Sequence, residues 1–148
     1  MEEVGHALNG EQLSQLARYF EEAVTFSKHM GCKVESVEPG RSVIYLDVKD
    51  IHLNGNGTLH GGVYSALMDN AMGLAVSALA GFRTATIALN VSFLGAVREG
   101  RITCRCEVVH RSRRLATAEA KVYDGGGELV ALGTGTFRIF EKRGNPIV

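Results

Sequence analysis

The sequence lacks a net charge. Its 16 lysines and arginines are balanced by 16 aspartates and glutamates. Proteins that bind nucleic acid non-specifically depend on an excess of basic residues. We therefore expect no nucleic-acid partner, and we expect any anionic ligand to be held by a local basic patch.

Cysteine is also scarce, with three residues in the chain. An odd number argues against a closed disulfide framework. Cys104 and Cys106 alternate along an expected strand and share one face, so they are interpreted as core residues, and their spacing does not match a zinc motif. The sequence thus predicts no metal or other cofactor and a reducing compartment, the cytoplasm.

Targeting and membrane signals are missing from the pattern as well. The first ten residues, MEEVGHALNG, contain neither a basic nor an apolar signal-peptide region. The longest weakly polar stretch, residues 61–81, contains Asp69 and Asn70, so we expect no membrane span. No internal repeat or low-complexity tract is visible.

What is present is an ordinary globular composition. The chain has 148 residues, of which 45% are hydrophobic and 22% charged. This length suits one domain, residues 1–148, that buries about two thirds of the surface exposed by the unfolded chain.

Two helices are expected. Apolar residues recur at helical spacing after Asn9, which forms a capping box with Gln12, and Gly31 is a plausible stop. This pattern predicts one amphipathic helix over residues 10–29. Residues 61–80 are apolar nearly all round, which predicts a buried helix.

The remaining pattern predicts strands. Apolar and polar residues alternate in five or six segments. These segments are residues 32–37, 42–48, 86–93, 102–108, 115–123 and 128–140. Short turns between them, such as the glycine-rich turn at 124–127, favour an antiparallel sheet. We therefore predict an α+β fold in which five to six strands wrap around the long central helix, and pairing of the open sheet edges predicts at least a dimer.

The segment before the buried helix carries the chemical signal. Gly61 and Gly62 stand at the expected helix start, where backbone N–H groups have no internal partner and attract negative charge. Glycine lets a ligand carbonyl approach these groups closely. The arrangement is typical of an oxyanion hole.

Asp69 is the second candidate. It lies about two turns into the apolar helix, too deep to act as a cap. An isolated acid among apolar residues is a candidate general base, because burial can raise the pKa of a carboxyl group. A purely structural hydrogen-bond acceptor is an equally open interpretation.

The other polar residues also have structural interpretations. The loop before the helix can be a plain connection, and His60 is more often structural than catalytic. Without further information, Arg111, Arg113 and Arg114 are expected at a solvated strand end.

At this point the sequence resembles a known family. The run HLNGNGTLHGGVYSALMDNAMG is similar to the PaaI-like acyl-CoA thioesterases of the hotdog superfamily, and RRLATAEAKVYDGGGELVALGTGTF is similar to their final strand pair. The resemblance covers about residues 30–140. It implies the hotdog fold described above.

The resemblance also implies site residues. Asp69 matches the carboxylate that acts as general base or nucleophile, and Gly61 matches the donor to the thioester carbonyl. Catalytic assistance is implied for Asn54, Thr86 and, in a positional role, His60. The resemblance, together with the residues around the motif, further suggests a set of substrate-binding residues. These are Gly62, Tyr64, Met68, Arg111, Arg113 and Arg114, the arginines toward the CoA phosphates and pantetheine arm.

The expected function is hydrolysis of a small to medium acyl- or aryl-CoA to the free acid and CoA. The resemblance implies active sites at the subunit interface of a dimer or of a dimer of dimers (a homotetramer). A non-catalytic acyl-CoA-binding protein and, less favoured, a hydroxyacyl-thioester dehydratase are the alternatives. The sequence leaves the acyl group open.

Overall fold

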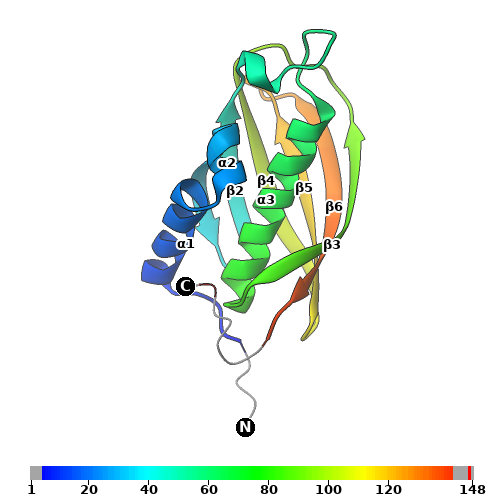
Figure 1. Ribbon diagram of the computed structural model, residues 1–148. Helices are drawn as coiled ribbons and strands as arrows, with labels where there is room; N and C mark the ends of the chain where they lie inside the picture. Colours follow the sequence, from blue (N-terminus) through cyan, green and yellow to red (C-terminus); the bar gives the residue numbers. More distant parts are fainter. Residues whose placement is uncertain (1–4, 142–146, 148) are drawn as a thin grey trace.

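A computed structural model describes residues 5–141 and residue 147. It contains three α-helices, one short 3-10 helix and six strands (Figure 1). In chain order these are α1 (Gly10–Glu22), α2 (Thr25–Met30), β1 (Lys33–Glu38), β2 (Arg41–Asp47), η1 (Asp50–His52), α3 (Gly61–Ala80), β3 (Thr84–Phe93), β4 (Arg101–Arg111), β5 (Leu115–Tyr123) and β6 (Leu129–Ile139).

The six strands form one antiparallel sheet in the order β1-β2-β4-β5-β6-β3. The helix α3 lies across one face of this sheet, with α1 and α2 beside it (Figure 1). The predicted α+β architecture, with a six-stranded sheet around a long central helix, is confirmed. The strands β1 and β3 are the two open edges.

The N-terminal helical region differs from the single helix predicted over 10–29. Asn9 and Gln12 form the predicted capping box, but α1 ends at Glu22 and the backbone at Val24 is extended (φ −80°, ψ 96°). A second helix, α2, then ends at Gly31, whose φ of 82° is left-handed. The break turns Ser27 and Met30 into the core, which a continuous amphipathic pattern does not reveal.

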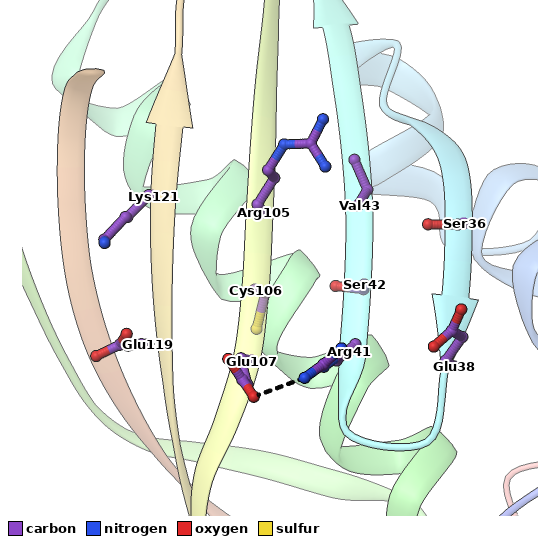
Figure 2. Close-up of a pocket in the computed structure, with 10 residues that line it drawn as sticks. All are labelled: Ser36, Glu38, Arg41, Ser42, Val43, Arg105, Cys106, Glu107, Glu119 and Lys121. Atoms are coloured by element: carbon purple, nitrogen blue, oxygen red, sulfur yellow. Dashed lines mark hydrogen bonds and ion pairs between the residues drawn. The ribbon is translucent and has the colours of Figure 1, made fainter. Parts of the chain in front are cut away.

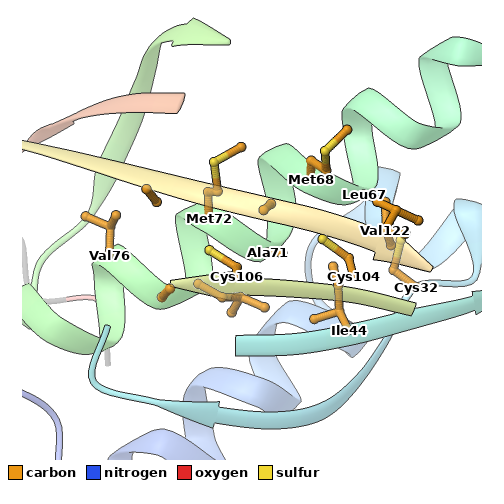
Figure 3. Close-up of a cluster of buried hydrophobic side chains, with 14 of the residues drawn as sticks. Cys32, Ile44, Leu67, Met68, Ala71, Met72, Val76, Cys104, Cys106 and Val122 are labelled. Carbon is orange, nitrogen blue, oxygen red and sulfur yellow. The ribbon is translucent and has the colours of Figure 1, made fainter. Parts of the chain in front are cut away.

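The core lies between α3 and the sheet (Figure 3). Leu67, Met72 and Val76 of α3 are fully buried and meet buried side chains of the strands. Cys104 and Cys106 are buried among them, as the alternation predicted. The helix is long and apolar enough to span a membrane by length and composition alone, but here much of it is packed inside the protein.

Two glycines of β6 let α3 approach the sheet. A Cβ atom at Gly133 would lie 2.6 Å from the carbonyl oxygen of Asn90 and 3.4 Å from the sulfur of Met68. At Gly135 it would lie 3.0 Å from the sulfur of Met72. A side chain at Gly133 would clash with the backbone of β3, and one at Gly135 would displace the side chain of Met72 on α3.

The outer face of the sheet carries a shallow, charge-balanced hollow (Figure 2). Three basic and three acidic residues line it, namely Arg41, Arg105, Lys121, Glu38, Glu107 and Glu119. Arg41 pairs with Glu107 at 3.2 Å, and both side chains are mostly exposed. The face is a solvated strand surface on the opposite side of the sheet from α3.

Candidate active site

The start of α3 leaves one backbone donor free. His60 is the N-cap, and its Nδ1 accepts the N–H of Gly62 at 2.8 Å. The carbonyl oxygen of His60 accepts the N–H of Val63 at 2.9 Å. The N–H of Gly61 meets no acceptor within residues 5–141. His60 therefore holds the helix start, in the positional role expected of it, while Gly61 keeps a donor for a ligand.

Asn54 lies in a tight loop that precedes α3. Its Oδ1 accepts the N–H groups of Asn56 at 2.9 Å and Thr58 at 3.2 Å. Its Nδ2 donates to the hydroxyl of Thr58 at 2.9 Å. The oxygen is thus occupied, while the second Nδ2 hydrogen remains for a ligand.

Asn54 and Gly61 line one hollow of about 430 Å³. Tyr64 lines the same hollow, and its hydroxyl donates to the carbonyl oxygen of Gly95 at 3.2 Å. Burial, with a smaller contribution from Asp124, raises the pKa of Tyr64, so its hydroxyl keeps its proton. The ring of Tyr64 packs edge-on against Phe93.

Asp69 lies in a different hollow, a groove of about 320 Å³ between α1 and β3. Its Oδ1 accepts a hydrogen bond of 2.6 Å from the hydroxyl of Thr86. Its Oδ2 has no partner among the described residues. In the single chain the carboxylate is half-buried and faces an accessible groove, rather than the enclosed apolar setting that the sequence suggested.

One chain alone does not bring these groups together. Asp69 lies eight residues after Gly61 on α3, which separates them by about 12 Å along the helix. A thioester carbonyl cannot contact both. However, β3 is an open edge with exposed apolar side chains, including Ile87 at 58% and Phe93 at 52% exposure. Such an edge favours pairing with a second copy.

Not every predicted substrate-binding residue lies at a hollow. Met68 is fully buried and its sulfur faces Gly133 in the core (Figure 3). The N–H of Gly62 is occupied by His60. Tyr64 alone of these three residues lines the same hollow as Gly61.

The arginine cluster lies near the last turn of α3. Arg111 donates to the carbonyl oxygen of Leu79 at 3.3 Å, where a cation stabilises the helix end. Arg113 pairs with Glu141 at 2.9 Å and holds the pKa of that carboxyl below its usual range. The side chain of Arg114 is exposed. A contact of these arginines with CoA phosphates stays a prediction.

The sequence analysis missed the other walls of the Asp69 groove. Tyr19 and Phe20 of α1, Ser77 of α3 and Arg83 and Thr84 near the start of β3 all line it. One signal was available, because Asp69, Gly73 and Ser77 recur every four residues and so share one face of α3. Within the described residues no cluster of His, Cys, Asp or Glu could hold a metal ion.

An antiparallel sheet wrapped around one long helix is the hotdog fold. The model of a family described as thioesterase superfamily matches residues 56–131, which include the helix start, α3, the strands β3, β4 and β5 and the first residues of β6. This match covers both Gly61 and Asp69. The chain therefore belongs to the thioesterase superfamily.

Individual relatives agree with this membership. A protein of Sulfurisphaera tokodaii, named only as an esterase, is 32% identical over 76% of this chain and 84% of its own length. The 1,4-dihydroxy-2-naphthoyl-CoA hydrolase of Listeria monocytogenes is 28% identical over 77% and 94%. A mutant of the phenylacetic acid degradation protein PaaI from Thermus thermophilus matches with a TM-score of 0.74 and 33% identity, over 78% and 99%. The resemblance to PaaI-like proteins is thus confirmed.

Proposed function

We propose that the protein hydrolyses acyl-CoA thioesters at a site shared by two copies of the chain. The observation that carries this proposal is the combination of a half-buried carboxylate beside a groove and a free backbone donor at a helix start. Membership of the thioesterase superfamily supports hydrolase activity in general. The particular substrate and the residue roles are our proposal.

In the proposed reaction, Asp69 takes a proton from a water molecule. The water oxygen attacks the thioester carbon, and the carbonyl oxygen becomes negatively charged. The N–H of Gly61 in the second copy stabilises this oxyanion, and the amide of Asn54 orients the thioester or the water. The carbon–sulfur bond then breaks, the CoA thiolate takes the proton from Asp69, and the carboxylic acid leaves.

The hydrogen bond from Thr86 gives Asp69 a defined orientation. It fixes Oδ1, so that Oδ2 is the oxygen available to the water. A positioned general base contributes about 10²–10⁴ in rate, and one oxyanion donor about 10²–10³.

The proposed site requires a dimer through β3. Two antiparallel copies of this edge would extend the sheet and bring Asp69 of one copy toward the start of α3 in the other. The exposed apolar residues of β3 and the separation of the two hollows within one chain support this arrangement. A homotetramer and a cytoplasmic location stay predictions.

The substitution Asp69→Asn tests the proposal. It keeps the shape of the side chain but removes the base, so hydrolysis of several acyl-CoAs should fall at least a hundredfold. CoA release can be followed with a thiol reagent, because burial raises the pKa of Cys32 to about 11 and that of Cys106 to about 12, which keeps these thiols unreactive.

The matched control is Glu119→Gln on the outer face of the sheet, which should retain full activity. Near-wild-type turnover by Asp69→Asn would refute the assignment. Binding of acyl-CoA without CoA release by the wild type would favour the non-catalytic alternative. Formation of an enoyl product from a 3-hydroxyacyl-CoA would favour the dehydratase.

A further inference from the structure

The groove beside Asp69 has a chemical gradient along its length. At one end lie Asp69 and Thr86, where the thioester would react. The buried apolar side chains of Phe20, Leu74 and Phe137 line the section between the two ends, while the polar side chains of Tyr19 and Asn70 also contribute to the wall. The far end is polar again, and it is formed by Ser77, Thr84 and Arg83.

The two hydroxyls at the far end are poorly satisfied. Ser77 is only 5% exposed, so its hydroxyl has little access to water. Its oxygen lies 3.4 Å from that of Thr84, which is a long hydrogen bond. Two hydroxyls can donate and accept more bonds than this single contact uses. Because both residues line the groove, a ligand atom at this end could fill the remaining capacity.

A cation stands beside the two hydroxyls. Arg83 lines the same end of the groove, and it has no ion-pair partner within the part of the chain that is described. A guanidinium next to two hydroxyl donors is a suitable setting for a carboxylate, because Arg can form paired bonds with both oxygens. An acyl chain that ended in a methyl group would leave the spare hydrogen-bonding capacity of the Ser77 hydroxyl unused, while the exposed Arg83 would stay hydrated.

The apolar middle of the groove favours the acyl group over the pantetheine arm of CoA. Pantetheine carries an amide close to its sulfur atom, and that amide would lie beside Phe20 and Leu74. On α3 this section is lined by Gly73, which has no side chain, and by Leu74, whose side chain forms no hydrogen bond, while the amide of Asn70 lies closer to Asp69 in the helix. An amide placed there would be desolvated without a partner, whereas methylene groups would be well accommodated.

The length of the groove limits the length of the acyl chain that it can hold. Ser77 lies eight residues beyond Asp69, about 12 Å along α3. A water molecule at Asp69 and a hydrogen bond at Ser77 occupy part of this distance. They leave about 6 Å, which is the span of an extended acyl chain of about six carbons.

We infer that the groove between α1 and β3 takes the acyl group of a dicarboxylic acid monothioester, with its free carboxylate bound by Arg83, Ser77 and Thr84. This inference rests on the proposed thioesterase function and names the substrate class. Arg83 and Ser77 are then specificity-determining residues. They act on the tail of the substrate and leave the reacting carbonyl untouched.

The test compares adipoyl-CoA, the monothioester of a six-carbon dicarboxylic acid, with hexanoyl-CoA. We expect the wild type to hydrolyse adipoyl-CoA with about tenfold higher kcat/KM. The substitution Arg83→Gln should remove this preference by raising KM for adipoyl-CoA alone, and Ser77→Ala should reduce it. The control Arg105→Gln, on the outer face of the sheet, should preserve it.

The result separates this inference from the proposed function. Hydrolysis of hexanoyl-CoA as good as or better than that of adipoyl-CoA would overturn the inference while the thioesterase function stands. A preference that survives both Arg83→Gln and Ser77→Ala would overturn it as well. If Ser77→Leu weakens the binding of free CoA and of both substrates equally, the pantetheine arm lies in the groove instead. Absence of hydrolysis with any acyl-CoA would overturn the function itself.

Discussion

At the scale of single residues, the contacts of Asp69 explain its proposed role. Thr86 donates to one carboxylate oxygen at 2.6 Å, and the other oxygen has no hydrogen-bond partner among the described residues of the groove. A short hydrogen bond to a charged acceptor is among the stronger ones in proteins. It fixes the carboxylate in one orientation, which is what a general base requires.

Replacing Thr86 by valine should therefore impair catalysis without affecting folding. Thr86→Val keeps the branched shape on an exposed edge strand but removes the donor to Asp69. We expect kcat to fall about tenfold, because the variant loses a charge-assisted hydrogen bond to Asp69. Thr86→Ser retains the hydroxyl and should stay close to wild type. Equal rates for the valine and serine variants, measured by CoA release, would show that the bond is not needed.

The backbone donor of Gly61 can be removed separately. Proline is tolerated at the first position of a helix, and it has no N–H. Gly61→Pro should therefore keep α3 and lower kcat by about 10²–10³ through loss of the oxyanion donor. Gly61→Ala is the matched control, because it adds a Cβ in the same place, 3.3 Å from the ring of Phe93, but retains the N–H. If alanine and proline reduce kcat equally, the effect is steric and the oxyanion role is wrong.

Sequence reasoning located Asp69 and Gly61 because both break a pattern, an acid in an apolar helix and a glycine pair at its start. It could not show that the carboxylate is only half-buried, since this depends on the groove formed by α1 and β3. It did not find Ser77, Thr84 and Arg83, because hydroxyls and an arginine after a helix are common. Their proposed role follows from the fold, which places all three residues at one end of a groove.

At the scale of elements, α3 was predictable and the N-terminal helices were less so. The predicted range 61–80 matches α3 because a capping residue, a glycine start and a left-handed Gly81 mark both ends. The region 10–29 contains no such mark at Val24, where the backbone is extended. Tertiary packing of Ser27 and Met30 decides the break.

The close packing around Gly133 of β6 makes a stability prediction. At Gly133 an added Cβ would clash with the backbone of β3, 2.6 Å from the carbonyl oxygen of Asn90. Gly133→Ala should lower the free energy of unfolding by about 2 kcal/mol or more, in the range of overpacked cores. Gly125→Ala in the hairpin turn, where the nearest atom is 3.7 Å away, should be tolerated. Urea denaturation of both variants checks this, and equal stability would mean that the strands shift at no cost.

At the scale of the whole molecule, the proposed site needs groups from two copies of the chain. The carboxylate of Asp69 and the backbone donor of Gly61 line two separate hollows. The strand β3 is an open edge of the sheet and exposes apolar side chains. The sequence predicted open sheet edges, and the strand order of the structure identifies β3 as one of them. The proposal that two copies share a site is based on the separation of the two groups along α3, about 12 Å from Gly61 to Asp69.

The most direct test of the shared site mixes two inactive variants, Asp69→Asn and Gly61→Pro. In a mixed dimer one site carries both defects and the other carries neither. If subunits combine at random after joint refolding, the account predicts about a quarter of wild-type CoA release, although each variant alone is inactive. A mixture that forms mixed dimers and stays as inactive as its components would contradict it, because both groups would then belong to the same chain.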